Sequence, residues 1–311
     1  MKYTYLGPAG TFTEQALLQV PGVQEGERLP ATSVNLALQL VRDGDADAAM
    51  VPIENSVEGG VSATLDAIAR GGALQIVREV LVPITFVLVA REGITDVSQI
   101  RTVSTHGHAI AQCRGWVETH LPGAEFVPAS STAAGALGLL DPDCRYDAAI
   151  CSPLVLEQNP LNLVRRGVED NTGAVTRFVL VTHPGAVPPP TGNDKTTVVI
   201  PLPEDHPGAL MGILEQFAAR GVNLSRIESR PTGQGLGSYF FSVDVEGHLA
   251  EARVADALAG LHRISPDIRF LGSYPSATEL DQPAPSPARH NTDEAFARAH
   301  AWVRMLRGHG T

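Results

Sequence analysis

The sequence is poor in aromatic residues, in basic charge and in cysteine. Aromatic residues make up 5% of the 311 positions, so the core must consist mainly of Val, Leu, Ile and Ala. A net charge of −11 argues against nucleic acid or an anionic membrane as a partner, because such partners need a basic surface. A hydrophobic content of 43% with 18% charged residues is typical of a globular chain with a large core.

Disulfides, metals and membrane segments also find little support. Cys113, Cys144 and Cys151 are scattered without a C-x-x-C pair, which disfavours a zinc site and a disulfide framework. The N-terminus lacks the apolar segment of a signal peptide. The longest apolar run, 80–90, is interrupted by Pro83 and is far shorter than the roughly 20 residues that span a bilayer. We therefore expect a soluble cytoplasmic protein with no metal and no membrane partner.

Residues 1–183 alternate β-rich runs with helical patterns, which predicts an α/β domain. Thr11 and Glu14 have the spacing of a capping box for a helix through Val20. Ser33 is expected to cap a second helix that stops near Gly44. The predicted strands are 3–6, 48–51, 80–90 with a bend or break at Pro83, 102–104, 125–127, 148–151 and 178–182.

Short patterns in this domain occur twice in the same order. The recurring pairs are ATS at 31–33 with ASS at 129–131, DAAM at 47–50 with DAAI at 147–150, and FVLV at 86–89 with FVLV at 178–181. The alternative is a chance recurrence of letters that buried strands favour. We prefer a duplication, which predicts two α/β lobes with the FVLV strands as crossovers. That is the architecture of periplasmic binding proteins, with a ligand cleft between the lobes.

A proline-rich stretch separates this domain from the rest of the chain. Residues 184–194 contain four prolines and two glycines, which excludes a helix or a central strand and indicates a semi-rigid linker. Strands and helices then alternate over 195–275 in the order βαββαβ, which predicts a ferredoxin-like module. In the tail, 276–311, we expect disorder over 281–289 and a short helix over 293–307.

Two familiar motifs carry little weight. The glycines of 233–237 lie between two predicted strands, so a hairpin turn is favoured over a dinucleotide site. His106 and His108 form an H-x-H pair, but no third metal ligand can be located, so a loop pair is favoured over a metal site.

Polar segments adjoin the predicted strands, where ligands of open α/β sheets bind. They are GPAGTFT at 7–13, PIENS at 52–56, THGHAIAQ at 105–112 and Thr176-Arg177. Each has a structural alternative, such as a helix cap at Thr11 or Ser131 and an Asx turn at Asn55. Arg177 enters a buried strand and needs a partner. A bidentate ligand carboxylate and an internal Asp or Glu are the two alternatives.

These segments, in this order, resemble the signature segments of the prephenate dehydratase family. The resemblance rests on GPAGTFT, VPIENSVEGG, THGHAIAQC, the turn at 130–132 and Thr176-Arg177-Phe178. In the second module, HPGAL at 206–210 and ESRP at 228–231 resemble the phenylalanine-binding motifs of the family's regulatory ACT domain. The chain departs from the family where Thr105-His106-Gly107 replaces Ser-His-Pro and where Met211 replaces a valine.

The resemblance implies conversion of prephenate to phenylpyruvate, water and carbon dioxide, with feedback inhibition by L-phenylalanine bound to the ACT domain. No redox step occurs in this reaction, so no cofactor is expected. The resemblance also implies a homodimer or homotetramer, because ACT modules commonly bind their effector at a dimer interface. Arogenate dehydratase and a non-catalytic amino-acid sensor are the alternative functions.

The resemblance also assigns residues to roles. Thr176 would donate a hydrogen bond to the leaving hydroxyl, Arg177 would bind a carboxylate and Phe178 would pack against the substrate. The substrate-binding residues would be Thr11, Asn55, Ser56, Thr105, Gln112 and Ser131. The effector-binding residues would be His206, Pro207, Gly208, Ala209, Leu210, Asn223, Leu224, Glu228, Ser229, Arg230 and Pro231.

Overall fold

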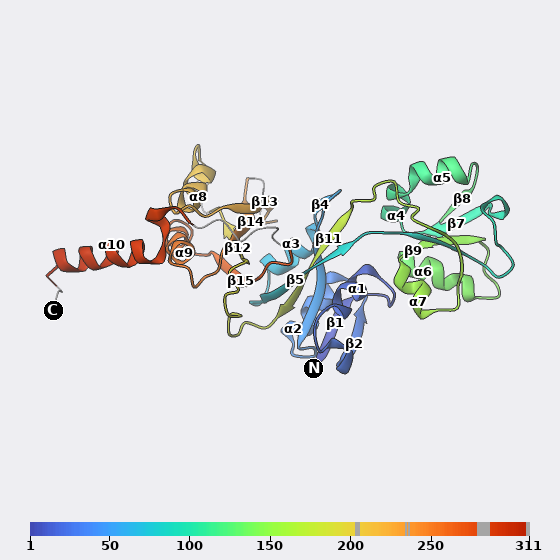
Figure 1. The fold of residues 1–311 in the computed structure, drawn as a ribbon, viewed down its shortest axis with the longest axis horizontal. Coiled ribbons are helices and arrows are strands. Elements are labelled where there is room, and N and C mark those ends of the chain that lie inside the picture. The colour runs from blue at the N-terminus through green and yellow to red at the C-terminus, as the bar shows by residue number, and fades with distance from the viewer. Residues whose placement is uncertain (203–205, 234, 236, 279–286, 309–311) are drawn as a thin grey trace. The chain divides into compact units, whose positions relative to one another are not determined.

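The computed structural model describes residues 1–202, 206–233, 235, 237–278 and 287–308 (Figure 1). The chain forms two compact units, one of Met1–Thr64 and Val80–Leu180 and the other of Leu65–Glu79 and Val181–Thr311. The sequence pattern predicts a single uninterrupted domain over 1–183, whereas 65–79 groups with the C-terminal unit. Side chains of this segment form ion pairs within that unit, which a sequence pattern does not reveal.

The first lobe is a mixed sheet with helices. Its strands lie in the order β2 (Glu27–Ala31), β1 (Lys2–Leu6), β3 (Ala48–Asn55), β11 (Val175–Thr182) and β5 (Gln75–Pro83), and the short β4 (Gly59–Gly60) pairs with β3. Its helices are α1 (Phe12–Leu18), α2 (Val34–Arg42) and the 3₁₀ turn η1 (Val23–Glu25). The helix α3 (Ser62–Ala69) begins in the first unit and continues into segment 65–79 of the other unit. As predicted, the apolar run breaks at Pro83, because proline cannot donate to a strand ladder.

The second lobe repeats this arrangement. Its strands lie in the order β10 (Asn162–Arg166), β6 (Val87–Ala90), β9 (Ala148–Cys151), β7 (Thr102–Thr105) and β8 (Glu125–Pro128). Its helices and 3₁₀ turns are η2 (Val97–Gln99), α4 (Gly107–Gln112), α5 (Arg114–His120), α6 (Thr132–Leu137), η3 (Gly138–Leu140) and α7 (Pro153–Gln158).

The predicted duplication is confirmed by strand order and by equivalent contacts. The order β2-β1-β3-β11 in one sheet matches β8-β7-β9-β6 in the other. Asp47 accepts a hydrogen bond from the backbone nitrogen of Lys2 at 2.7 Å, and Asp147 accepts one from that of Thr102 at 3.1 Å. Asp47 therefore joins the turn before β3 to the start of β1, and Asp147 joins the turn before β9 to the start of β7.

The two crossovers between the lobes run side by side. The Ile84 nitrogen donates to the Ala174 oxygen at 2.8 Å, and the Gly167 nitrogen donates to the Phe86 oxygen at 3.0 Å. The strands β6, which begins at the second residue of the first FVLV, and β11, which contains the second FVLV, follow from these crossovers into different sheets. The predicted crossover role of the repeated strands is therefore confirmed.

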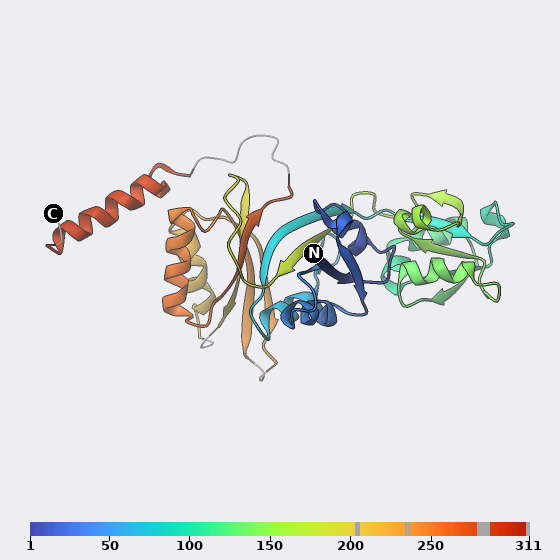
Figure 2. The ribbon, with the colours of Figure 1, turned by 90° about the horizontal axis from the view of Figure 1, so that it is seen from below.

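The C-terminal unit contains the predicted βαββαβ module. Its elements are β12 (Asp194–Pro201), α8 (Ala209–Ala218), β13 (Leu224–Pro231), β14 (Tyr239–Glu246), α9 (Ala252–Ile264) and β15 (Arg269–Pro275). The antiparallel sheet has the order β13-β14-β12-β15, and both helices lie on one of its faces (Figure 2). Val198, Ile213 and Phe217 belong to the apolar core between them.

The remaining predictions concern the turn at 233–237 and the tail. β13 and β14 pair antiparallel as a hairpin requires, although Gln234 and Leu236 lie outside the described residues. The predicted tail helix is confirmed as α10 (Asp293–Leu306), after the turn η4 (Arg289–Asn291). Most of the segment expected to be disordered, at 281–286, lies outside the described residues. No helix of the described residues is long and apolar enough to cross a membrane.

Candidate functional site

Two segments that the sequence separates by more than a hundred residues meet where β3 ends and β11 begins. The Asn55 side-chain nitrogen Nδ2 donates to the Thr176 hydroxyl oxygen Oγ1 at 2.8 Å. The backbone nitrogen of Ser56 donates to the Val175 oxygen, and the Val175 nitrogen donates to the Ser56 hydroxyl, both at 2.9 Å. Asn55, Ser56 and Thr176 are therefore held together by both backbone and side chains.

The orientation of the Asn55 amide decides what the Thr176 hydroxyl can do. The Asn55 oxygen Oδ1 accepts from the backbone nitrogens of Val57 at 2.8 Å and Glu58 at 3.1 Å, which forms the anticipated Asx turn. Those two donors fix the oxygen on the turn side, so Nδ2 must face Thr176. Because Thr176 accepts this bond, the Asn55 amide does not use the hydrogen of the Thr176 hydroxyl.

Arg177 and Phe178 follow on β11 and are buried. Phe178 is 2% exposed and Arg177 is 6% exposed. The guanidinium nitrogen Nη1 of Arg177 lies 3.3 Å from Oε2 of Glu54 at the end of β3. Of the two partners considered for Arg177, the internal acid is the one seen here. The Glu54 side chain is 37% exposed, so this ion pair is open to competition from a ligand carboxylate.

Residues from α4 of the second lobe approach the Asx turn of the first. The Glu58 carboxylate lies 3.2 Å from Nδ1 of His108 and 3.5 Å from Nε2 of Gln112. Gln112 thus reaches the same turn as Asn55 and Ser56. The spacing of each motif cannot predict this group, because its members come from two lobes.

The histidine pair itself has a structural role. Nδ1 of His106 accepts from the His108 backbone nitrogen at 3.3 Å and caps α4, and the two rings stack at 5.1 Å. Burial, reinforced by the charge of His108, lowers the pKa of His106, which suits a neutral acceptor. Among the described residues no group of three His, Cys, Asp or Glu is placed to hold a metal.

Three other predicted substrate-binding residues make structural contacts. Thr11 caps α1 and Ser131 caps α6, each accepting from a backbone nitrogen three residues ahead. The predicted capping box is modified, because Glu14 accepts from Gly10 at 2.6 Å instead of from Thr11. Thr105 is fully buried and donates to the Ile150 oxygen at 2.7 Å. These hydroxyls are engaged with the protein itself.

Sequence reasoning missed three members of the site. Glu54, Glu58 and His108 are absent from the predicted residues, although all three lie within the motif segments at 51–60 and 105–113. The only available signal was the need of a buried Arg177 for an acidic partner, and it could not say which acid.

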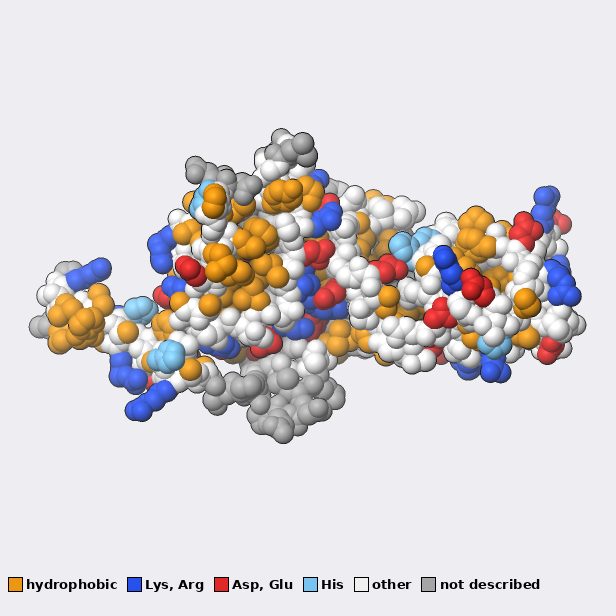
Figure 3. Space-filling model, turned by 90° about the horizontal axis from the view of Figure 1, so that it is seen from above, with side chains coloured by type: hydrophobic (Ala, Val, Ile, Leu, Met, Phe, Trp, Pro, Cys, Tyr) orange, Lys and Arg blue, Asp and Glu red, His pale blue; other side chains and the backbone are white. Residues whose placement is uncertain are grey.

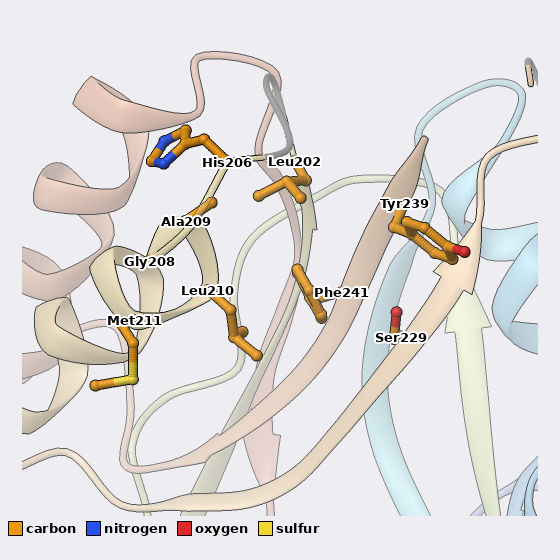
Figure 4. A pocket seen from close by; sticks show the side chains of 9 residues that line it. All are labelled: Leu202, His206, Gly208, Ala209, Leu210, Met211, Ser229, Tyr239 and Phe241. Carbon is orange, nitrogen blue, oxygen red and sulfur yellow. The ribbon is translucent and has the colours of Figure 1, made fainter. Parts of the chain in front are cut away.

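A second candidate site is a pocket of about 250 Å³ between the start of α8 and the sheet of the C-terminal unit (Figure 4). Five predicted effector residues line it: His206, Gly208, Ala209, Leu210 and Ser229. The apolar side of the pocket was not predicted and consists of Leu202, Met211, Tyr239 and Phe241.

The start of α8 suits a small anion bordered by apolar groups. Gly208 is the N-cap of α8 with φ of +91°, a conformation that disfavours any residue with a Cβ. Gly208 makes no side-chain cap. The Ala209 nitrogen donates to the His206 oxygen at 3.0 Å, and the next backbone N–H groups of this ten-residue helix are the ones suited to an anion. Leu210 approaches from α8 itself and Phe241 from the sheet (Figure 4).

The surface around this pocket is apolar as well. Hydrophobic side chains, in orange, gather on the C-terminal unit (Figure 3). Of the large apolar residues that line the pocket, Leu210, Met211 and Tyr239 are exposed, and Met211 is the most exposed of the three at 58%. A group of exposed large apolar side chains is typical of a surface that binds a ligand or another protein.

The other predicted effector residues do not line this pocket. Arg230 makes a two-point ion pair with Asp66, and Asn223 donates to Glu246 at 2.9 Å. The Glu228 carboxylate lies 3.7 Å from Nη1 of Arg226. Pro207 and Pro231 offer backbone oxygens to His206 and Arg70, and Leu224 packs on the core.

Models of two known protein families together match most of the chain. The family model "Prephenate dehydratase" matches residues 3–186, and the model "ACT domain" matches 196–263. The prephenate dehydratase of Amycolatopsis methanolica is 45% identical over 306 residues, which cover 98% of this chain and 97% of the relative.

Two solved structures are similar to this chain over most of its length. The prephenate dehydratase of Arthrobacter aurescens in complex with L-Phe has a TM-score of 0.93 and 65% identity, covering 99% of this chain and 100% of that one. A more distant structure, GqqA, is described as a novel type of quorum quenching acylase. It has a TM-score of 0.78 and 31% identity over 89% of this chain and 98% of its own.

Proposed function

The chain belongs to the prephenate dehydratase family, and we propose that the group around Asn55 and Thr176 converts prephenate to phenylpyruvate, water and carbon dioxide. The observation that carries this proposal is the Asn55–Thr176 hydrogen bond, which directs the threonine hydroxyl away from the amide. The two relatives that match almost the whole chain at 45% and 65% identity both carry the dehydratase name.

The chemistry asks for a hydrogen-bond donor and carboxylate binding. The bond from the ring to the departing carboxylate breaks, and its electron pair enters the ring as the C–O bond to the hydroxyl breaks. Hydroxide must take up one proton to leave as water. Formation of an aromatic ring makes the reaction strongly downhill, so the site needs to orient the substrate and assist the leaving group.

The residues of the site suit these tasks. The Thr176 hydroxyl donates to the leaving oxygen and relays a proton, while Asn55 holds its oxygen in place. Arg177 exchanges Glu54 for a substrate carboxylate, since a guanidinium binds either carboxylate in the same way. Gln112 and Ser56 orient the remaining polar groups. Roles for Thr11, Thr105, Ser131 and Phe178 in substrate binding stay predictions.

The test is the formation of phenylpyruvate from prephenate, followed by absorbance in alkali. We expect turnover by the unchanged chain and its loss in Thr176→Ala. Arogenate offered in parallel distinguishes the sister reaction, because a higher kcat/KM on arogenate would reverse the assignment of substrate. Folded protein that turns over neither compound would contradict the proposal and favour an amino-acid sensor.

We also propose that the pocket at α8 binds L-phenylalanine as a feedback inhibitor. The α8 N-terminus provides donors for a carboxylate, and Leu202, Leu210 and Phe241 provide an apolar wall for a ring. The Arthrobacter aurescens relative was solved with L-Phe. Calorimetric titration should show saturable binding of L-phenylalanine, and a chain that binds none would overturn this assignment.

A homodimer or homotetramer and a cytoplasmic location complete the proposed function. Both rest on the resemblance and on the sequence, and the exposed apolar side chains of the C-terminal unit support association of copies (Figure 3). Sedimentation with and without L-phenylalanine tests the oligomeric state, and a purely monomeric chain under both conditions would contradict it.

A further inference from the structure

The strand β13 carries the ESRP motif and presents its residues to two different environments. Successive side chains of a strand point to opposite faces of the sheet. Ser229 lines the pocket and pairs in register with Phe241, which lines it as well. Arg230 pairs in register with Phe240 and belongs to the opposite face. One motif therefore touches both the effector pocket and whatever covers the other face of the sheet.

Segment 65–79 covers part of that other face. Arg230 donates from Nε to Oδ1 of Asp66 at 3.0 Å and from Nη2 to Oδ2 at 2.9 Å. This bidentate contact raises the pKa of Arg230. The Arg70 side chain adds a bond to the Pro231 oxygen at 3.4 Å. The helix α3, which contains Asp66, is thus joined to the C-terminal end of β13, close to the pocket-lining Ser229.

Two further contacts hold the same segment to the sheet. Nζ of Lys195, at the start of β12, lies 2.9 Å from Oε1 of the fully buried Glu79. Gly272 on β15 has φ of +140° and lies so close to the Ile76 backbone that a Cβ there would clash. The attachment of 65–79 is therefore specific. Arg70 reaches a backbone oxygen of the ESRP motif, whereas Asp66 pairs with a charged side chain of that motif.

The same helix leads back to the catalytic residues. α3 contains both Thr64 and Asp66 within a single run of eight residues. The Thr64 hydroxyl donates to the Pro52 oxygen at 2.5 Å, and the Val61 nitrogen donates to the Ile53 oxygen at 2.9 Å. Pro52 and Ile53 lie on β3, which ends at Asn55. A short helix cannot move at Asp66 without moving Thr64, because its backbone bonds make it one rigid element.

We propose that the Asp66–Arg230 ion pair transmits occupation of the effector pocket through α3 to the end of β3, and so couples phenylalanine binding to catalysis. The proposal rests on the proposed function. Asp66 is then a positioning residue for inhibition and contacts neither substrate nor effector. Removing its carboxylate should separate effector binding from inhibition.

The test compares Asp66→Asn with a matched control in the full chain. Asp256→Asn removes a carboxylate from another ion pair of the same unit, between Arg220 and Asp256 at 2.6 Å. The two aspartates are similarly exposed, at 28% and 33%. Allosteric couplings typically change affinity by about 5- to 150-fold. We expect Asp66→Asn to bind L-phenylalanine with unchanged affinity yet to lose inhibition, while Asp256→Asn stays inhibited.

Several results would overturn the proposal. Asp66→Asn inhibited to the extent of the unchanged chain would show that the ion pair transmits nothing. Loss of phenylalanine binding in Asp66→Asn would place the pair in recognition instead of transmission. Failure of the proposed function looks different, because then the unchanged chain itself does not turn over prephenate.

A second variant guards against a folding defect. The double change Asp66→Arg with Arg230→Asp restores an ion pair of reversed polarity. If Asp66→Asn melts well below Asp256→Asn, the double variant decides. Inhibition regained in the folded double variant supports transmission through the pair, and continued turnover without inhibition despite phenylalanine binding overturns it.

Discussion

Replacing Thr176 by valine removes one hydroxyl and preserves the shape of the side chain. Thr176 is 7% exposed on β11, and its Oγ1 accepts the Asn55 amide at 2.8 Å. The structural cost is one unsatisfied, half-buried N–H group, or about 1 kcal/mol. Asn55 keeps both backbone bonds to its oxygen, so the Asx turn should survive. We therefore expect a folded protein with a slightly lower Tm.

The catalytic cost should be much larger than the structural one. Loss of a single preorganised donor to a developing negative charge typically lowers kcat by about 10²–10³. The charge on the leaving oxygen develops mainly in the transition state, so KM should change little. Phenylpyruvate absorbance in alkali measures both constants. Thr176→Ser restores the hydroxyl and should recover most of the activity.

A matched control lies on the same strand. Thr182 closes β11, and its hydroxyl bonds the His183 oxygen at 2.9 Å, so Thr182→Val removes an equivalent group away from Asn55. Its kcat should match that of the unchanged chain. If Thr176→Val keeps kcat within about threefold of the unchanged chain, the hydroxyl is not the donor and the role inferred from the amide orientation is wrong.

Three further predictions follow from single side chains. Arg177→Lys keeps the charge but loses the planar fork, and Arg177→Ala loses both, so kcat/KM should fall further in the alanine variant. The loss in Arg177→Ala should correspond to about 2–5 kcal/mol of transition-state stabilisation. Near-normal kcat/KM in Arg177→Ala would exclude carboxylate binding by this side chain. Gly208→Ala places a Cβ at φ of +91°, which costs about 1–2 kcal/mol in the conformation that forms the pocket. The phenylalanine concentration for half-inhibition should therefore rise by roughly 5–30-fold in steady-state assays. If that concentration is unchanged, the effector binds elsewhere. Burial and the charge of His108 lower the pKa of His106 below its usual 6.5, so the unfolded chain binds the proton more tightly and stability falls as the pH drops through 6.5. The Tm at pH 5 should lie below the Tm at pH 7.5. His106→Asn can still cap α4 but does not titrate in this range, so it should reduce the difference between the two Tm values. If that difference is the same in His106→Asn, His106 is not its cause.

The lobes were predictable because their central strands are short, buried and rich in β-branched residues. The repeated DAA and FVLV letters mark β3, β9, β6 and β11, and all four lie inside their sheets. Strands β2 and β10 escaped prediction for the opposite reason. Pro30 in β2 and Arg165 and Arg166 in β10 are suited to edge strands, where one side of the ladder is unpaired and the hydrophobic alternation is weak.

Part of the proposed catalytic group was predictable and part was not. Asn55 and Thr176 belong to motifs at strand ends, so their meeting follows once the sheet is known. Glu54 and Glu58 are ordinary acidic residues in the sequence, and only the fold pairs them with Arg177 and His108. The same holds for the apolar wall of the proposed effector pocket, since the sequence does not distinguish Leu202 and Phe241 from core residues.

The ESRP motif shows what a motif hides when it is treated as one unit. Within β13 the side chains alternate, so Ser229 reaches the pocket while Glu228 and Arg230 reach the charged face with Arg226 and Asp66. Strand periodicity over 224–231 divides the motif in this way from the sequence alone. What periodicity cannot supply is the partner, because Asp66 lies more than a hundred and fifty residues earlier in the chain. A motif that lines a pocket on one face and is anchored on the other has the geometry that a transmitted signal requires.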